Sequence, residues 1–285
     1  MNSEARLESD IKPVTARTHD RVTGVDIRVD RAGAGRPLAV LNGLLGLNQH
    51  WFPCLSRWVN KAECFVLQPP LLEMRGPGCS VDGVTRLTVS VLETLVDQPA
   101  VLVGNSLGGH VALRIAMERP DLVRALVLVG SSGLFERGFE RGVEHNPSRT
   151  WLERKIRELF HDPARMWPGM VEEAYAELSR RSAARALVKL GRSAKNDHLG
   201  EKLAGLRTPA LLVWGREDIV TPPEVAEQFH VLLPNSKLVW LDRCGHAPQI
   251  ERPDELSAAI ADYLDELDLA DRITLVPGAS RAGAA

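Results

Sequence analysis

The sequence predicts an α/β protein with a mostly parallel central sheet, helices on both faces of the sheet and an inserted helical region. Two observations carry this prediction. Short apolar runs with the length of buried strands alternate with segments that have the periodicity of helices, a pattern typical of a parallel sheet covered on both faces. The alternation stops near Ser132 and resumes after Leu203, and the stretch between has only helical periodicity and many charges.

Strands and helices are expected to alternate along the rest of the chain. Val25–Val29 alternates apolar and polar residues, which is typical of a half-exposed edge strand. The other strands are expected to be buried because their residues are mainly apolar. These strands are 38–41, 64–67, 100–103, 125–129, 210–214 and 237–241, and helices are expected at 84–96, 109–117, 223–232 and 254–267.

The helical stretch divides the predicted core into two parts. We expect a core of residues 14–131 and 204–269, with residues 132–203 inserted as a helical cap. The insertion cannot lie within the sheet, so we expect it over the carboxyl ends of the strands, where ligands bind in open α/β sheets. Residues 1–13 are expected to be an N-terminal tail and residues 270–285 a C-terminal tail, whose last stretch is rich in Gly and Ala and expected to fray.

Composition excludes several classes of function. The chain has 285 residues, of which 44% are hydrophobic and 25% charged, with a net charge of −2, so neither nucleic acid nor an anionic membrane is an expected partner. No apolar run approaches the roughly 18 residues that a membrane span needs, and the polar N-terminus has no signal-peptide pattern. The four cysteines, far apart and without a C-x-x-C pair, are expected to be reduced thiols in a cytoplasmic protein.

A serine in a tight turn is the most informative local feature. Residues 104–108 read Gly-Asn-Ser-Leu-Gly, after the apolar run Val101–Val103 and before a helix-length stretch that stops at Pro120. Strand, sharp turn and helix with Ser106 at the turn is the pattern of a nucleophile elbow. The small residues Gly104 and Gly108 allow the neighbouring chain to pass close. The free N–H groups at the helix start would stabilise negative charge on a substrate oxygen.

A serine nucleophile needs a base, and the base needs an orienting acid. His246 is the best base, because it follows the strand 237–241 in a loop with Gly245 and Pro248. Asp218 is the best acid, because it follows the strand 210–214, and the neighbouring Glu217 is the alternative. His110 falls on the helix after Ser106 and is expected to pack or to face solvent. No cluster of metal ligands is found, and neither a metal nor an organic cofactor is expected.

The order Ser106, Asp218, His246 and the surrounding motifs resemble the α/β-hydrolase superfamily, in particular its serine hydrolases with a helical cap domain, over roughly residues 25–267. The matching segments are GNSLGG at 104–109, WGREDIVTP at 214–222 and GHAPQIERP at 245–253. The resemblance implies that Ser106 is the nucleophile, His246 the general base and Asp218 its orienting acid. It also implies an oxyanion hole formed by the backbone N–H groups of Leu44 and Leu107.

Two segments depart from the pattern of many relatives. Asn42 stands where an H-G-x-x-G motif has its His, so Asn42 must replace the hydrogen bonds that brace this loop. Glu73 stands where relatives often have Asp in D-x-R-G-x-G-x-S, a loop to which we assign no role. Asn42 and Trp51 are possible pocket residues, and core packing is the alternative for Trp51. The basic residues of the insertion are expected on a solvated face: Arg180, Arg181, Arg185, Lys189, Arg192 and Lys195.

Three functions remain open at this point. The first is a serine hydrolase that cleaves a carboxylic ester through an acyl-enzyme, with a small-molecule substrate that carries an apolar acyl group. The second is a carbon–carbon bond hydrolase of the meta-cleavage product type, which often has G-N-S-x-G-G at the elbow but an aromatic residue where Ala247 stands. The third is a non-catalytic ligand receptor on the same fold.

Overall fold

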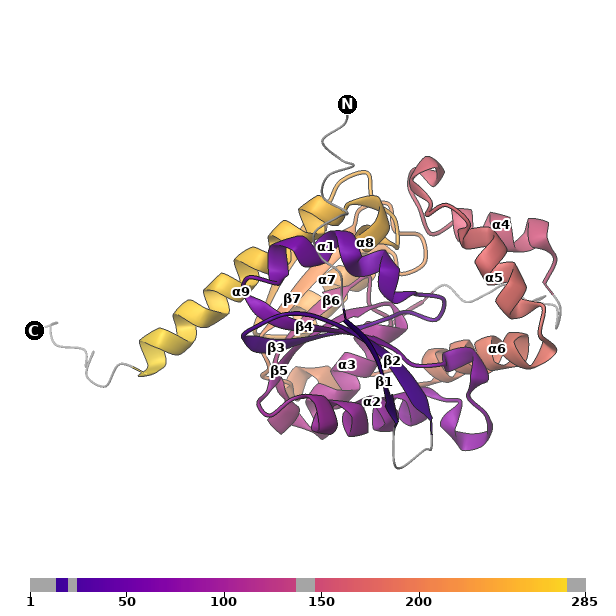
Figure 1. Ribbon diagram of the computed structural model, residues 1–285. Helices are drawn as coiled ribbons and strands as arrows, with labels where there is room; N and C mark the ends of the chain where they lie inside the picture. Colours follow the sequence, from indigo (N-terminus) through magenta and orange to yellow (C-terminus); the bar gives the residue numbers. More distant parts are fainter. Residues whose placement is uncertain (1–13, 20–24, 137–146, 276–285) are drawn as a thin grey trace, which may run out of the picture.

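The strands of the protein form one mixed sheet. The computed structural model describes residues 14–19, 25–136 and 147–275, and these residues contain an eight-stranded sheet in the order β1-β2-β4-β3-β5-β6-β7-β8 (Figure 1). The strands from β4 to β8 in this order are parallel, and β2 runs antiparallel to both β1 and β4. The bounds are β1 Val14–His19, β2 Asp26–Gly33, β3 Arg36–Leu41, β4 Ala62–Gln68, β5 Ala100–Asn105, β6 Val123–Val129, β7 Ala210–Gly215 and β8 Ser236–Leu241.

Helices cover both faces of the sheet (Figure 1). The α-helices are α1 Phe52–Trp58, α2 Val81–Leu95, α3 Leu107–Glu118, α4 Arg149–Arg157, α5 Met170–Leu178, α6 Arg181–Asn196, α7 Pro223–Leu232, α8 Pro248–Glu251 and α9 Pro253–Leu275. Short 3-10 helices are η2 Asn48–Trp51, η3 Leu71–Glu73, η4 Gly76–Gly78, η5 Pro120–Leu122, η6 Pro163–Arg165 and η7 Gly200–Gly205. Within the described part of the chain, none of the helices is both apolar and long enough to span a membrane.

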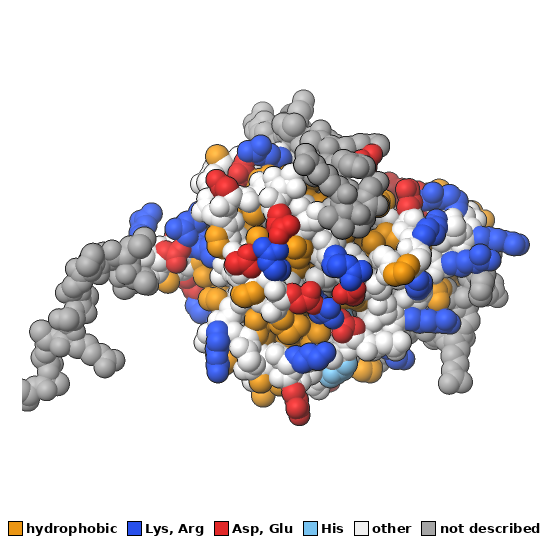
Figure 2. Space-filling view, turned by 90° about the horizontal axis from the view of Figure 1, so that it is seen from below, with side chains coloured by type: hydrophobic (Ala, Val, Ile, Leu, Met, Phe, Trp, Pro, Cys, Tyr) orange, Lys and Arg blue, Asp and Glu red, His pale blue; other side chains and the backbone are white. Residues whose placement is uncertain are grey.

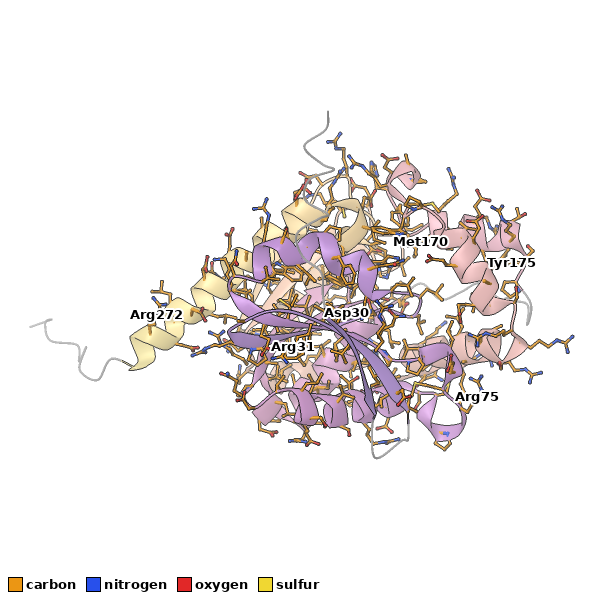
Figure 3. All side chains as sticks on the ribbon, in the orientation of Figure 1. Asp30, Arg31, Arg75, Met170, Tyr175 and Arg272 are labelled. Atoms are coloured by element: carbon orange, nitrogen blue, oxygen red, sulfur yellow. The ribbon has the colours of Figure 1, made fainter. Side chains whose placement is uncertain are left out.

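The alternation of side chains along the strands divides the core into two layers. On β5, Ala100 and Leu102 pack in a cluster with α2, α3 and α7, whereas Val101 and Val103 pack in a cluster with α1 and α9. Period-two alternation therefore fixes which helices β5 supports. On β2 the burial pattern is less regular, because the consecutive residues Val29 and Asp30 are both buried and Arg31 is exposed; Asp30 and Arg31 are labelled in Figure 3.

The fold class and the expected strands are confirmed, with two differences in detail. The expected edge strand Val25–Val29 overlaps β2, which is not an edge strand, because β1 pairs with it on one side and β4 on the other. α9 continues to Leu275, so the first part of the expected tail at 270–285 is helical. The expected N-terminal tail at 1–13 and the end of the chain from 276 lie outside the described residues.

The helices α4, α5 and α6 lie between β6 and β7 in sequence, and Figure 1 shows them beside the sheet rather than in it. The buried face of α6 consists of Ala and Leu residues, and its other face carries basic side chains. The basic residues named above are exposed, as expected: Arg180, Arg181, Arg185, Lys189, Arg192 and Lys195. Figure 2 shows Lys and Arg side chains gathered on the right of the view.

Trp58 offers a test of the layer beneath α1 and α9. Its side chain is fully buried, and its Nε1 donates a hydrogen bond to the carbonyl of Ser257 on α9 (3.0 Å). We expect Trp58→Ala to lower the free energy of unfolding by about 3–5 kcal/mol, because the change leaves a cavity. Urea denaturation measures this value. The control Val231→Ala, at an exposed position, should change the free energy of unfolding by less than about 0.5 kcal/mol. Equal effects of the two variants would contradict the packing described for Trp58.

Candidate active site

Ser106 lies in a strained turn between β5 and α3. Its backbone has φ 53° and ψ −118°, a region that residues with a side chain rarely adopt. The turn is held because the N–H of Ser106 donates to the carbonyl of Val129 (3.1 Å) and the N–H of Ser132 donates to the carbonyl of Ser106 (3.1 Å). The neighbouring strand β6 and the loop after it therefore fix the nucleophile candidate.

The glycines on either side of Ser106 allow a close contact of backbones. A Cβ on Gly104 would lie 2.4 Å from the carbonyl group of Gly108, and a Cβ on Gly108 would lie 2.0 Å from the carbonyl oxygen of Leu41 on β3. Both distances are far below van der Waals contact. The sequence motif is thus explained by the tight approach of α3 to β5 and β3.

His246 and Asp218 form a hydrogen-bonded pair at the carboxyl ends of β8 and β7. The Nδ1 atom of His246 lies 2.8 Å from Oδ2 of Asp218, whose side chain is fully buried. The N–H groups of Val220 (2.8 Å) and Thr221 (2.9 Å) donate to Oδ1 of Asp218. Glu217, the alternative acid, instead accepts from the N–H of Cys244 (2.8 Å), so the residue that contacts the histidine is Asp218.

Thr221 was not predicted to belong to the site. Its Oγ1 donates to Oδ2 of Asp218 (2.9 Å) and lies 3.3 Å from Nδ1 of His246. A signal was present in the sequence, because an Asp followed three residues later by Thr at the start of a loop favours a turn closed by side-chain hydrogen bonds. Thr221 holds the carboxylate in the orientation that meets the imidazole.

Asn105 joins the histidine loop to the serine turn. Its Nδ2 donates to the carbonyl of His246 (3.1 Å) and to the carbonyl of Val129 (2.9 Å). Because Asn105 directly precedes Ser106, this side chain keeps the loop of His246 beside the elbow. The loops that follow β5, β7 and β8 thus meet at one edge of the sheet, as parallel strands require.

The segment after α4 contacts the same histidine loop. The N–H of His246 donates to the carbonyl of Leu159 (2.7 Å). The carboxylate of Glu251, which is buried, accepts from the N–H groups of Gly245 (2.7 Å), His161 (3.2 Å) and Asp162 (2.6 Å). Backbone of the inserted region is therefore bonded to the loop that carries the candidate base.

The loop after β3 lies beside Ser106. A Cβ on Gly43 would be 3.3 Å from Cβ of Ser106, which places Leu44, the next residue, at the edge of the same site. Asn42 braces this loop: its Nδ2 donates to Oδ1 of Asn48 (2.7 Å) and to the carbonyl of Leu67 (2.9 Å). Leu107, the residue of the second expected oxyanion donor, is the first residue of α3.

Trp51 is a core residue rather than a pocket residue. Its side chain is 1% exposed and packs with Trp58 in the layer next to α1 and α9. Nε1 of Trp51 donates to Oδ1 of Asn42 (3.0 Å), so the Trp51 side chain supports the loop after β3. Asn42, itself buried, makes three hydrogen bonds within this network, which accounts for its presence where relatives have His.

The electrostatics of the histidine follow from its neighbours. Burial lowers the pKa of His246, but the charge of Asp218, its hydrogen bond and the charge of Glu136 raise it, and the net pKa is above the ordinary value of 6.5. Glu136, partly buried in the loop after β6, has its own pKa raised by burial, while His246 lowers it and Asp218 raises it. The imidazole is thus in an environment that stabilises its protonated form, which a base needs in order to accept a proton.

Two other buried histidines, His50 and His110, have different environments. Burial lowers the pKa of His50 to about 4, and its ring packs against Trp167 with ring centroids 5.8 Å apart. His110 lies on α3, is fully buried, and its Nε2 is 3.1 Å from Oδ2 of Asp197. Neither is bonded to the serine turn through its ring.

Two relatives are similar to this chain over most of its length. The chain is 30% identical over 87% of its length to a 2-hydroxymuconate semialdehyde hydrolase of Pseudomonas sp. (strain CF600), of which the match covers 93%. It is 28% identical over 80% of its length to a pimeloyl-[acyl-carrier protein] methyl ester esterase of Nitrosomonas europaea, of which the match covers 96%.

A solved structure has the same architecture. It is an α/β hydrolase enzyme from the metagenome of sediments of the Mar Chica lagoon in Morocco, with a TM-score of 0.70 and 29% identity, and the match covers 85% of this chain and 96% of that chain. The model of the alpha/beta hydrolase family matches residues 13–259. The chain therefore belongs to the α/β hydrolase family, and it is a hydrolase.

Proposed function

We propose that the protein is a serine hydrolase that cleaves a carboxylic ester through an acyl-enzyme intermediate. The observation that carries the proposal is the Asp218–His246 hydrogen bond of 2.8 Å, held through Asn105 against the strained turn of Ser106. A base oriented by a buried carboxylate, next to a serine at the start of a helix, is the arrangement that activates a hydroxyl for attack on a carbonyl.

The first half of the reaction forms the acyl-enzyme. Ser106 Oγ attacks the carbonyl carbon of the ester while Nε2 of His246 takes the hydroxyl proton. The negative charge on the carbonyl oxygen is stabilised by the backbone N–H groups of Leu44 and Leu107. The carbon–oxygen bond of the ester then breaks, and His246 gives its proton to the departing alcohol.

Water completes the cycle. His246 takes a proton from water as its oxygen attacks the acyl carbon, and the same two N–H groups hold the oxyanion again. The bond to Ser106 then breaks, the serine regains a proton from His246, and a carboxylic acid is released. Asp218 stays ionised throughout and keeps the imidazole in one orientation. In this proposal α4, α5 and α6 form a cap, and an apolar acyl group binds under it.

A second candidate is hydrolysis of a carbon–carbon bond in a meta-cleavage product. Similarity to the 2-hydroxymuconate semialdehyde hydrolase favours it, since 93% of that protein is matched. Ala247, directly after His246, disfavours it, because hydrolases of that type characteristically have an aromatic residue at this position. The same nucleophile, base and acid would serve both reactions.

The ester proposal is tested with two substrates and a covalent probe. We expect p-nitrophenyl butyrate to be hydrolysed at least tenfold faster than 2-hydroxymuconate semialdehyde, and a fluorophosphonate to label Ser106. Ser106→Ala should lose labelling and lower kcat by about 10⁶-fold, since the nucleophile is removed. The inverse preference would support the carbon–carbon reaction. A folded wild-type protein that neither reacts with the probe nor turns over either substrate would be a receptor.

Adjacent carboxylates in the loop after β7 provide a matched pair of variants. Asp218→Asn should lower kcat by about 10⁴-fold, because the amide favours the wrong tautomer of His246. Glu217→Gln should leave kcat within about threefold, because Glu217 bonds the backbone of Cys244 and not the histidine. Steady-state kinetics on p-nitrophenyl butyrate measures both. Comparable losses in the two variants would be inconsistent with the assigned acid.

The raised pKa of His246 predicts the pH dependence. Only the neutral imidazole accepts a proton, so kcat/KM should fall as the pH is lowered, with its midpoint above 6.5. Glu136→Gln removes a negative charge that stabilises the protonated ring, so the midpoint should move to lower pH. The control Glu153→Gln, at a half-buried residue of α4, should not move it. A midpoint that stays in place or moves upward in Glu136→Gln would refute the electrostatic assignment.

A further inference from the structure

The helix α6 touches the core near both proposed oxyanion donors. In its first half, Ala183 and Leu187 belong to an apolar cluster of the inserted helices, together with Leu152 and Leu178. Leu44 and Leu45, in the loop after β3, pack against this cluster. One side of the proposed oxyanion hole therefore packs against an apolar cluster to which α6 contributes.

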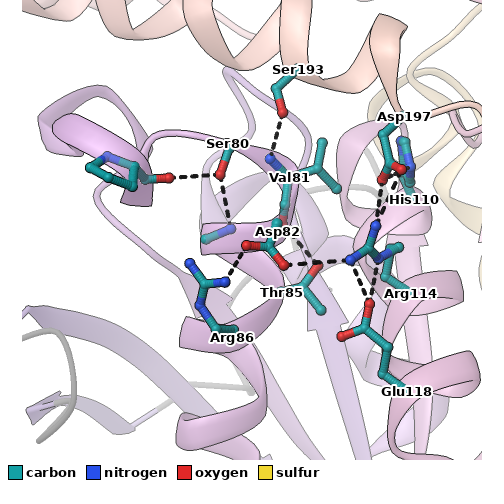
Figure 4. Close-up of polar contacts among 12 residues, drawn as sticks. Ser80, Val81, Asp82, Thr85, Arg86, His110, Arg114, Glu118, Ser193 and Asp197 are labelled. Carbon is teal, nitrogen blue, oxygen red and sulfur yellow. Dashed lines mark hydrogen bonds and ion pairs between the residues drawn. The ribbon is translucent and has the colours of Figure 1, made fainter.

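The other end of α6 is bonded to the elbow helix α3 through a single carboxylate. Asp197 directly follows α6, and its Oδ2 is 3.1 Å from Nε2 of His110 (Figure 4). Nη1 of Arg114 donates to Oδ1 (3.2 Å) and Oδ2 (3.0 Å) of the same residue. His110 and Arg114 are both on α3, whose first residue, Leu107, carries the second proposed donor.

The contacts of Asp197 are largely shielded from water. The side chain of His110 is completely buried, and those of Arg114 and Asp197 are 19% and 21% exposed. Burial lowers the pKa of His110 to about 4, although Asp197 acts to raise it, so the ring is neutral at pH 7. A neutral ring that donates from Nε2 leaves Arg114 as the cation that balances the carboxylate. Loss of the carboxylate would leave the buried donor of His110 without its partner and would remove one of the three carboxylates that pair with Arg114, the others being Glu118 and Asp82.

Two further hydrogen bonds, each donated by a backbone N–H group, flank this carboxylate. The N–H of Val81, at the start of α2, donates to Oγ of Ser193 (3.0 Å), as Figure 4 shows. The N–H of Leu199 donates to the carbonyl of Gly133 (2.8 Å) in the loop after β6. In that loop a Cβ on Gly130 would be 3.1 Å from Oδ2 of Asp218. Residues 193–199 are thus tied to α2, to α3 and to the loop beside the catalytic acid.

We propose that α6 is a strut that fixes the two oxyanion donors relative to each other, and that Asp197 is the positioning residue that anchors it. This inference rests on the proposed function. From Leu187 to Asp197 the helix spans about 15 Å, a rigid length between the loop of Leu44 and the start of α3. Oxyanion donors act only at about 2.7–3.1 Å from the charged oxygen, so a small displacement of one donor weakens transition-state binding. Ground-state binding of the ester depends much less on that distance.

The test separates positioning from stability. We expect Asp197→Ala to lower kcat on p-nitrophenyl butyrate by about 10- to 100-fold, less than complete removal of a donor, with KM within about twofold. Affinity for an alkyl trifluoromethyl ketone, which forms a charged hemiketal in the hole, should fall by the same factor. Asp197→Asn keeps an oxygen that accepts from His110 and should lie between Asp197→Ala and wild type.

Glu118→Gln is the matched control. Oε1 of Glu118 accepts from Nε of Arg114 (2.6 Å), so the variant perturbs the same arginine without touching α6. Its kcat should stay within twofold of wild type. The fraction of each protein labelled by fluorophosphonate at completion normalises kcat to folded enzyme, and a thermal melt reports stability.

Three outcomes decide the matter. Unchanged kcat and unchanged inhibitor affinity in Asp197→Ala would overturn the inference while leaving the proposed function intact. A loss of kcat that disappears after normalisation to labelled enzyme, or an equal loss in Glu118→Gln, would show a merely structural role and also overturn it. If wild type neither turns over esters nor becomes labelled, the proposed function fails and this inference with it.

Discussion

The structure around the site depends on one close contact of backbones, that of α3 with the ends of β5 and β3. The carbonyl of Leu41 occupies the place that a side chain at 108 would need, and Gly104 faces the same helix turn. This contact forces the chain to reverse within one residue, so Ser106 takes a positive φ. The strain, on the order of 1–3 kcal/mol, is sustained because the N–H of Ser106 donates to the carbonyl of Val129 and the carbonyl of Ser106 accepts from the N–H of Ser132. The other loops are then arranged around this fixed turn.

Much of the fold was predictable because its signals are local. Each buried strand is a short apolar run, and the residues proposed for catalysis follow three of these runs directly. The position of β2 was not predictable in the same way. Its alternating pattern describes one half-polar strand, whereas its place between β1 and β4 depends on antiparallel pairing with distant residues. The extension of α9 to Leu275 was missed because helix ends are weakly marked without a cap signal.

The parts of the site that sequence reasoning missed are side chains whose partners are far away in the chain. Asn42 raised the question of how its loop is held, and the answer lies in Asn48 and the carbonyl of Leu67. Asp197 and His110 are 87 positions apart, and no periodicity connects them. The sequence predicted Asp218 as the acid with Glu217 as the alternative, and the hydrogen-bond partners separate the two, since Asp218 contacts His246 and Glu217 the backbone of Cys244. Local pattern identifies residue types at strand ends, and only the folded chain assigns their partners.

The hydrogen bonds between Glu251 and the backbone of residues 161–162 limit how this part of the chain can be exchanged between relatives. An exchange of the whole segment between β6 and β7 with that of a relative would replace the backbone that positions the N–H groups bound by this buried carboxylate and the Leu159 carbonyl that accepts from His246. A chimaera that grafts a foreign insertion therefore needs a junction after Asp162, or a recipient whose residue at 251 is changed in parallel. The segment 159–162 is thus bonded to the loop after β8, although it lies between β6 and β7 in the sequence.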